Sequence, residues 1–186
     1  MLLLTSAAPL LAKTIKYPKE NPLFTIDVPA GWQVHYEGEG PLTIQTSDAA
    51  IVAVFDARLK GVEDAATAKQ ALAVQKKATA ETTGFTDFRE ITAAQKMQLS
   101  PGITAIGAQY HAKFPTGEPC IYTVAIFSPN GSDYCSAEFS IKARGLVKRL
   151  DEQRQAMIES ITPLDSEKGR ESDDDDAESK DSADEE

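Results

Sequence analysis

The sequence predicts one α+β domain built on an antiparallel β-sheet with helices packed against it. Over most of the chain, apolar and polar residues alternate at the two-residue period of a half-buried strand. Two segments, near residues 64–82 and 146–161, change to helical character. Turns rich in glycine, proline and asparagine separate the strands. A chain of 186 residues with 41% hydrophobic composition is long enough for one domain with a substantial core.

The first twelve residues form an uncharged apolar run that ends in small residues before Lys13. The run is too short to cross a bilayer as a helix, which takes roughly 20 residues. It matches the apolar region and small-residue end of a secretory signal, although the positive start is missing. We interpret residues 1–12 as a truncated signal peptide cleaved after Ala12, and we expect an exported chain, periplasmic or extracellular. The alternative is a short apolar strand of a cytoplasmic protein.

The stretch from residue 24 to residue 36 is interpreted as a central hairpin. Two alternating runs are interrupted by Pro29-Ala30-Gly31, and Lys13–Tyr17 adds a short edge strand before them. Trp32, the only tryptophan, falls at the first inward position after the turn. A core anchor is favoured over a ligand-stacking role, because large aromatic rings dominate core packing.

Two more strands follow, at Leu42–Gln45 and Ile51–Asp56. The second is apolar on both faces, which is typical of a central strand covered on each side. The glycines of residues 37–41 lack the spacing and the Lys-Ser or Lys-Thr pair of a phosphate-binding loop, so this segment is interpreted as a turn.

The next segment predicts a helix from Asp64, as N-cap, to about Thr82. It is rich in helix formers, and Gly84 stands just beyond its end. The stripe through Ala68, Leu72 and Gln75 is only weakly apolar. We therefore expect the helix to pack closely on the sheet with small side chains, without binding membranes.

Residues 85–143 predict a meander of strands. A short strand region is expected from Phe85 to Ile91, and Met97 and Leu99 precede a turn at residues 100–102. A long strand is expected from Ile106 to Phe114, with His111 facing outward. Two further strands are expected at Cys120–Ser128 and Cys135–Lys142. A helix from Leu146 to Ile161, with Leu146, Leu150, Met157 and Ile161 on one stripe, is expected to close the core before Pro163.

Asn130-Gly131 predicts a two-residue type I′ turn, which explains Asn130-Gly131-Ser132 without a glycan. That turn places Cys135 opposite Ile126 and Cys120 opposite Ile141. The two cysteines then share the inward face about 20 Å apart, whereas a disulfide needs Cα atoms within about 7 Å. We predict no disulfide between Cys120 and Cys135, and two buried thiols.

The net charge of −10 is concentrated at one end of the chain. Residues 165–186 contain twelve acidic and three basic side chains, so this segment carries a net charge of −9. We interpret 164–186 as an acidic disordered tail, favouring a solubilising role over a calcium site because the ligand pattern of a calcium loop is missing. The rest of the chain is nearly neutral and has no basic stripe, which excludes non-specific nucleic-acid binding. No membrane span is expected.

Motifs for catalysis are missing: there is no G-x-S-x-G, H-E-x-x-H, C-x-x-C or Walker-type sequence. The two histidines, His35 and His111, occupy outward strand positions, where a solvated imidazole is favoured over a catalytic base. The opposite facing of His111 and the cysteines disfavours a Cys-His nucleophile. The wide His and Cys spacing disfavours zinc. We assign no catalytic, cofactor-binding or metal-binding residues and expect no cofactor.

The order of elements and the motif F-T-I-D-V-P-A-G-W, from Phe24 to Trp32, resemble the PsbP-like fold over roughly residues 15–162. The resemblance implies an antiparallel sheet sandwiched by helices. The fold is found in an extrinsic protein of the oxygen-evolving complex, a Ran-binding nuclear transport factor and many exported bacterial proteins. Its members act mostly as non-catalytic binding or assembly proteins, so the resemblance implies fold and class only.

Together these observations predict residues 13–163 as one PsbP-like domain. We expect a non-catalytic exported binding or assembly module that acts through an unknown protein partner in the cell envelope. The alternative is a carrier of a small apolar ligand in a pocket between sheet and helix near Trp32. A hydrolase using His35 or His111 is the least favoured hypothesis.

Overall fold

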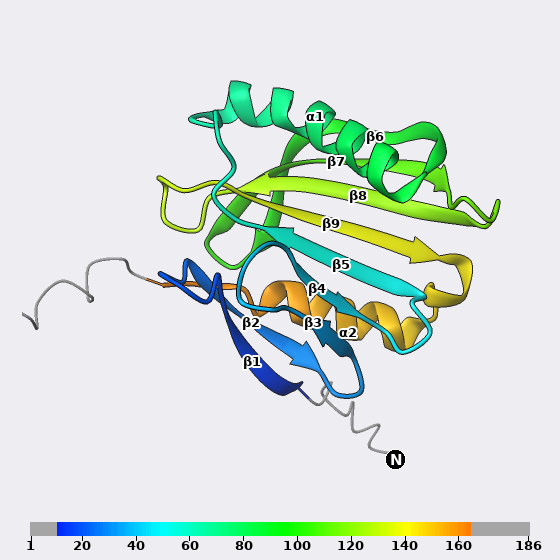
Figure 1. Ribbon diagram of the computed structural model, residues 1–186, viewed down its shortest axis with the longest axis horizontal. Coiled ribbons are helices and arrows are strands. Elements are labelled where there is room, and N and C mark those ends of the chain that lie inside the picture. The colour runs from blue at the N-terminus through cyan, green and yellow to red at the C-terminus, as the bar shows by residue number, and fades with distance from the viewer. Residues whose placement is uncertain (1–10, 165–186) are drawn as a thin grey trace, which may run out of the picture.

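The computed structural model describes residues 11–164 and confirms the α+β class (Figure 1). The signal peptide and the acidic tail predicted from the sequence lie almost wholly outside the described residues. The strands are β1 (Leu11–Tyr17), β2 (Phe24–Pro29), β3 (Gln33–His35), β4 (Leu42–Gln45), β5 (Ile51–Asp56), β6 (Thr86–Ser100), β7 (Ile103–Lys113), β8 (Pro119–Phe127), β9 (Cys135–Lys142) and β10 (Thr162–Pro163); the helices are α1 (Ala65–Thr83), the 3-10 turn η1 (Ala143–Gly145) and α2 (Lys148–Glu159).

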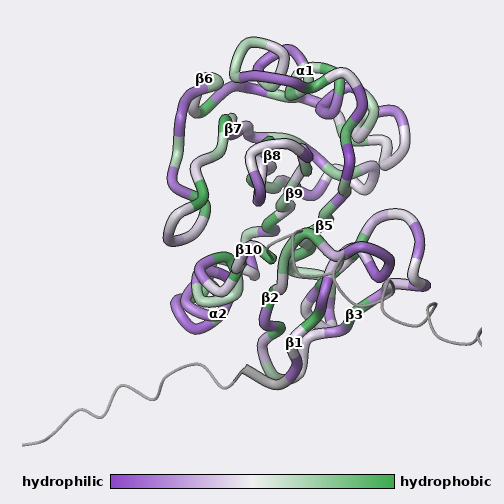
Figure 2. The backbone as a smooth tube through the Cα atoms, turned by 90° about the vertical axis from the view of Figure 1, so that its left-hand side faces the viewer, coloured by the Kyte–Doolittle hydropathy of each residue, from purple (hydrophilic) through white to green (hydrophobic). Residues whose placement is uncertain are grey.

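The domain has three layers, which Figures 1 and 2 show from two directions. The middle layer is a seven-stranded antiparallel sheet in the order β3-β4-β5-β9-β8-β7-β6. Helix α1 covers one face of it. Helix α2 and a three-stranded sheet, in the order β1-β2-β10, cover the opposite face. Neither helix of the described chain is both long and apolar enough to cross a membrane.

Each face of the middle sheet has its own hydrophobic core. The larger core lies between the two sheets and α2, and the smaller lies beneath α1. The larger core is built around Tyr17, Phe24, Ile26, Phe55, Phe127, Phe139 and Met157, and the smaller around Leu72, Phe85, Tyr110, Tyr122 and Val124. Because both faces are covered there, β9 is buried at positions that would face water in a two-layer protein. Strand β5 instead alternates between buried and half-buried residues, so the prediction that both of its faces are covered holds for one face only.

Helix α1 begins and ends where the sequence predicts. The Asp64 carboxylate accepts hydrogen bonds from the backbone N–H groups of Ala66 and Thr67, and Gly84 ends the helix with φ 72°. Ala68 and Leu72 are the helix residues that are fully buried. The helix therefore docks with little apolar area, as its alanine-rich stripe indicates.

The prediction that the two runs of residues 24–36 pair as a hairpin is wrong. Strand β2 pairs with β1 and β10, whereas β3 pairs with β4, so the two runs belong to different sheets. The turn itself forms, since the Trp32 backbone N–H donates to the Pro29 carbonyl at 3.2 Å. Alternation shows which face of a strand is buried, but it does not identify the neighbouring strand. The predicted edge strand at Lys13–Tyr17 is confirmed as part of β1.

The prediction of a two-residue turn at Asn130-Gly131 is also wrong. Residues 128–134 form a longer loop, in which the Asn130 side chain accepts hydrogen bonds from the Ser132 and Asp133 backbone N–H groups. The register becomes Phe127 opposite Cys135 and Cys120 opposite Lys142. A shift of one residue moves a side chain to the other face, so Cys120 lies in the core beneath α1 and Cys135 in the other core. Both thiols are free and buried, which confirms the prediction of no disulfide.

Two other elements differ from the prediction. Strand β6 is continuous over residues 86–100, with four register shifts, instead of two short pieces. The closing helix begins at Lys148, not Leu146, because the chain first makes the η1 turn. Leu146 and Val147 are left about half exposed, at 52% and 49%. Met157 and Ile161 are buried as predicted, but Pro163 belongs to β10.

The η1 turn packs closely against the middle sheet at Gly145. A Cβ atom on Gly145 would lie 2.7 Å from the Ala50 carbonyl oxygen and 2.9 Å from Ile51 Cγ1. We therefore expect Gly145→Ala to lower the free energy of unfolding by about 1–3 kcal/mol in urea denaturation, as overpacking does in cores. Gly107→Ala is a matched control, since its Cβ meets mainly the flexible Met97 side chain. Equal losses for the two variants would contradict the argument.

All the outer strands have features that oppose pairing with another chain. Strand β3 is three residues long, and β10 is two residues long and contains Pro163. Strand β1 carries Lys13 and Lys16, and β6 is interrupted by its register shifts. Short, charged or bulged edges are typical of proteins that avoid strand addition. A binding surface of this domain is therefore to be sought on its faces.

Candidate functional site

The face of the middle sheet opposite α1 is covered over only part of its area. At β7 and β8, Ala105, Ala125 and Phe127 are buried in the larger core. Further along the same strands the cover stops. Two successive cross-strand rows are half-buried or exposed there: Arg89–His111–Ile121 and Thr92–Gln109–Thr123. We name the side chains of these rows, with Lys113 and Pro119 beside them, the open corner.

Strands β6 and β7 place cations together at the open corner. Arg89 and His111 are directly opposite each other, and Lys113 follows His111 on the same face of β7. A pocket of about 300 Å³ lies here, lined by Asp87, Arg89, His111, Ala112, Lys113 and Pro119. Gln109 donates a hydrogen bond to Thr123 Oγ1 at 3.2 Å on the neighbouring row. The arrangement presents cationic and neutral hydrogen-bond donors on a rigid sheet.

Asp87 supplies the carboxylate of this pocket. It adopts φ 57° at a register shift in β6, and its Oδ2 lies 2.7 Å from Lys113 Nζ. The hydrogen bond from Lys113 lowers the pKa of Asp87 most, and the charges of Lys113 and Arg89 lower it further. A carboxylate at this position is thus stabilised by both cations at once.

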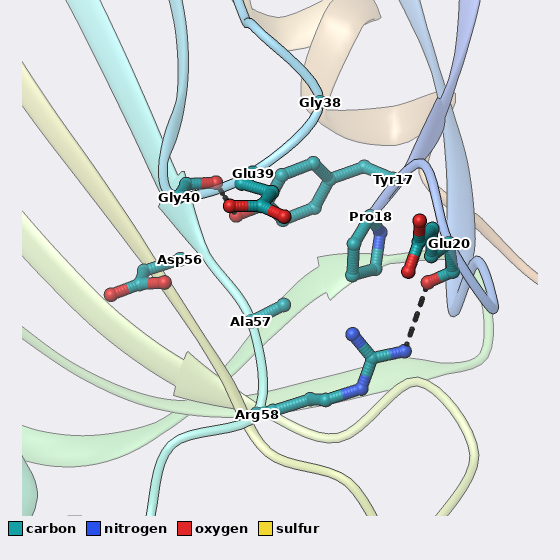
Figure 3. A pocket seen from close by; sticks show the side chains of 9 residues that line it. All are labelled: Tyr17, Pro18, Glu20, Gly38, Glu39, Gly40, Asp56, Ala57 and Arg58. Carbon is teal, nitrogen blue, oxygen red and sulfur yellow. Dashed lines mark hydrogen bonds between the residues drawn. The ribbon is translucent and has the colours of Figure 1, made fainter.

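A second pocket, of about 200 Å³, lies where β5 leaves the sheet (Figure 3). It is lined by Tyr17, Pro18, Glu20, Gly38, Glu39, Gly40, Asp56, Ala57 and Arg58. Figure 3 shows the Arg58 side chain reaching across to the Glu20 carbonyl, to which it donates at 3.2 Å. Burial, followed by the charge of Glu138, raises the pKa of Asp56. The Arg58 guanidinium is exposed, and its Nη2 also donates to the Asn21 carbonyl, so this pocket combines carboxylates with one cation that the backbone holds in place.

A buried carboxylate connects α1 to the sheet. Glu138 of β9 is only 8% exposed. It accepts hydrogen bonds from Gln75 Nε2 at 2.6 Å, Thr79 Oγ1 at 2.5 Å and the Tyr122 hydroxyl at 2.5 Å. Burial, and then the nearby Glu138 charge, raises the pKa of Tyr122. All these partners come from the domain itself, so the network is structural support for α1.

The structure does not bring the two histidines and the two cysteines together. His35 is exposed on β3 beside Gln45, with 3.3 Å between their Nε2 atoms, and His111 is exposed at the open corner. Cys120 lies on the opposite face of the sheet from His111. Within residues 11–164, no three His, Cys, Asp or Glu side chains have the geometry to hold a metal ion.

Trp32 is half-buried against the larger core, and its Nε1 donates to Gln153 Oε1 at 3.3 Å. It lines neither of the two pockets described above. No sequence motif points to Arg89 or Lys113. The outward position of Lys113 is visible in the sequence, since it follows His111 by two positions in one predicted strand. Nothing local indicated Arg89, because its place depends on the irregular pairing of β6.

No protein-family model and no curated protein matches the chain. Several solved structures do match the chain. PsbP (CyanoP) from Synechocystis sp. PCC 6803 superposes with a TM-score of 0.56 at 10% identity, covering 86% of this chain and 95% of that one. The chain has a PsbP-like fold. The resemblance noted in the sequence is thereby confirmed at the level of fold.

Two other solved structures also superpose on this domain. LpqN of Mycobacterium tuberculosis, a protein involved in cell envelope biogenesis, superposes with a TM-score of 0.51 at 15% identity, covering 82% of this chain and 91% of LpqN. A Bacteroides thetaiotaomicron VPI-5482 protein superposes with a TM-score of 0.55 at 13% identity, covering 84% of this chain. The chain spans about half the length of the Bacteroides protein, at 50%.

Proposed function

We propose that this PsbP-like domain is a non-catalytic exported module that binds a protein partner in the cell envelope through the open corner. The observation that carries the proposal is the incomplete cover of the middle sheet. Domains bury the apolar face of a sheet, yet here two cross-strand rows remain accessible and display polar and cationic side chains beside Ile121. Mixed polar and apolar faces of this kind are typical of transient protein interfaces.

The non-catalytic role is supported by the chemistry of the site. A general base or nucleophile needs a partner within hydrogen-bond reach. His111 stands between Arg89 and Ile121, and the thiols are buried in the two cores. Burial raises the pKa of Cys120 to about 11 and that of Cys135 to about 12, which keeps both thiols protonated and unreactive at neutral pH.

The envelope location is supported by two observations. The chain begins with an apolar run that matches a secretory signal, and LpqN, with the same fold, is involved in cell envelope biogenesis. We therefore propose an extracytoplasmic location for the domain.

Site-specific photo-crosslinking tests the function. A photoreactive amino acid replaces Pro119, an exposed uncharged residue of the pocket, and the protein is irradiated in native envelope extract. We expect one or a few discrete protein adducts, because the open corner is the docking face. The matched control carries the same amino acid at Val74, which is 68% exposed on α1 on the other face. Equal adducts from both positions, or none from Pro119, would contradict the proposal.

A further inference from the structure

We propose that the open corner binds the carboxylates of an acidic peptide segment of the partner, with Arg89 and Lys113 as the cationic anchors. This inference rests on the proposed function and names the chemistry that the site recognises. It starts from the position of Asp87, a carboxylate of the chain itself that already occupies the pocket.

Asp87 shows where a carboxylate fits. Its Oδ2 contacts Lys113 Nζ at 2.7 Å, and it is placed there by a left-handed backbone conformation at a register shift in β6. Aspartate tolerates this conformation better than most residues. The pKa of Asp87 is lowered by Lys113 and also by Arg89, so the field of both cations acts at this one point.

The internal carboxylate can be exchanged at little cost. The side chains of Lys113 and Asp87 are 49% and 51% exposed, and exposed ion pairs contribute little to stability. Arg89 is exposed, and its planar guanidinium can bind a carboxylate through two parallel hydrogen bonds. An incoming carboxylate can therefore pair with Arg89 and share or replace Asp87 at Lys113.

The surrounding residues favour a peptide over other anionic partners. Gln109 and Thr123 extend the site with neutral donors and acceptors, which suit a peptide backbone. Anionic membranes and nucleic acids are bound by larger clusters of Lys and Arg. The open corner has only Arg89 and Lys113 of these types, beside His111.

Binding of a fluorescent hexaglutamate peptide to the full-length chain, measured by anisotropy at low ionic strength, tests the inference. We expect saturable binding that weakens with added salt, and no binding of hexaglutamine. Arg89→Gln is expected to weaken binding by about fivefold, as loss of one partly exposed ion pair does. Asp87→Asn is expected to strengthen it by a similar factor, because the competing carboxylate is removed.

Glu81→Gln is the matched control for charge. It removes one negative charge and frees Lys77, its partner at 3.8 Å on α1, just as Asp87→Asn frees Lys113. We expect unchanged binding. Equal strengthening by both variants would show general attraction and overturn the inference. So would absence of hexaglutamate binding, or binding to phosphatidylglycerol vesicles without binding to the peptide.

The crosslinking readout separates this inference from the proposed function. If Arg89→Gln leaves the yield of Pro119 adducts unchanged, the inference of carboxylate recognition is contradicted, but the open corner is still the docking face. If Pro119 gives no adduct although hexaglutamate binds with the expected variant effects, the proposed function is contradicted, but the inference that the site binds carboxylates is supported.

Discussion

Replacing Glu138 with alanine is expected to lower the free energy of unfolding by about 3 kcal/mol and to loosen α1 before the rest of the domain. The substitution removes the common acceptor of three hydrogen bonds, from Gln75, Thr79 and Tyr122. Each buried donor left without a partner costs about 1–3 kcal/mol. Because α1 has only Ala68 and Leu72 fully buried, it has little apolar packing to compensate.

Urea denaturation gives the global effect, and amide hydrogen exchange along α1 gives the local one. Glu138→Gln is expected to lose only about 1 kcal/mol, since the amide keeps one acceptor and the Thr79 and Tyr122 hydroxyls can each accept instead of donate. The surface control is Glu159→Ala, which removes an exposed acceptor of Gln155 and is expected to change stability by less than about 0.5 kcal/mol. If Glu138→Ala and Glu159→Ala behave alike, the carboxylate does not hold α1.

The domain is expected to lose stability steeply in alkaline solution, from about pH 9 upward. Burial raises the pKa of Cys120 from 9.0 to about 11 and that of Cys135 from 9.0 to about 12. Burial also raises the pKa values of Tyr17 and Tyr122, with smaller contributions from Asp56 and Glu138 respectively. These groups stay protonated in the folded state at pH values where they ionise in the unfolded chain.

The sign follows from proton linkage. Between the unfolded and folded pKa values the folded state binds more protons, so the free energy of unfolding falls as pH rises. Each such group contributes a slope of about 1.4 kcal/mol per pH unit within its window. Their stabilisation is complete below about pH 9 and is lost as pH rises through the raised values.

Urea midpoints measured in a series from pH 7 to pH 12 check this expectation. Cys135→Ala is the informative variant, because it removes one of the groups from a fully buried position. Its stability can differ at every pH, but its slope above pH 9 is expected to be shallower by about 1.4 kcal/mol per pH unit. A midpoint that stays constant through pH 11 would contradict the burial of the thiols.

The candidate site was only partly predictable. His111 and Lys113 are outward residues of one predicted strand, so their exposure followed from alternation. Arg89 joins them through a pairing that skips residues at a register shift. The open corner is accessible because α2 and β2 do not extend over it. The sequence pattern within a single strand does not show how far other elements cover that strand.

The sequence alone determined the local elements, because their signals are local. The N-cap at Asp64, the C-cap at Gly84, the apolar run of β5 and the alternation along β7 place these elements correctly. The absence of a Cys120–Cys135 disulfide also held, since the two thiols remain far apart even after the register shift.

Only the tertiary structure decided how these elements meet. It separated β2 from β3, lengthened the β8–β9 loop and placed the two cysteines on opposite faces. It also buried Glu138, a charged residue of β9, by laying α1 over it, with Gln75 contacting it from 63 residues away in the chain. Strand pairing and layer contacts join residues distant in sequence, so their free energy is set by packing between elements and not by the pattern within any one of them.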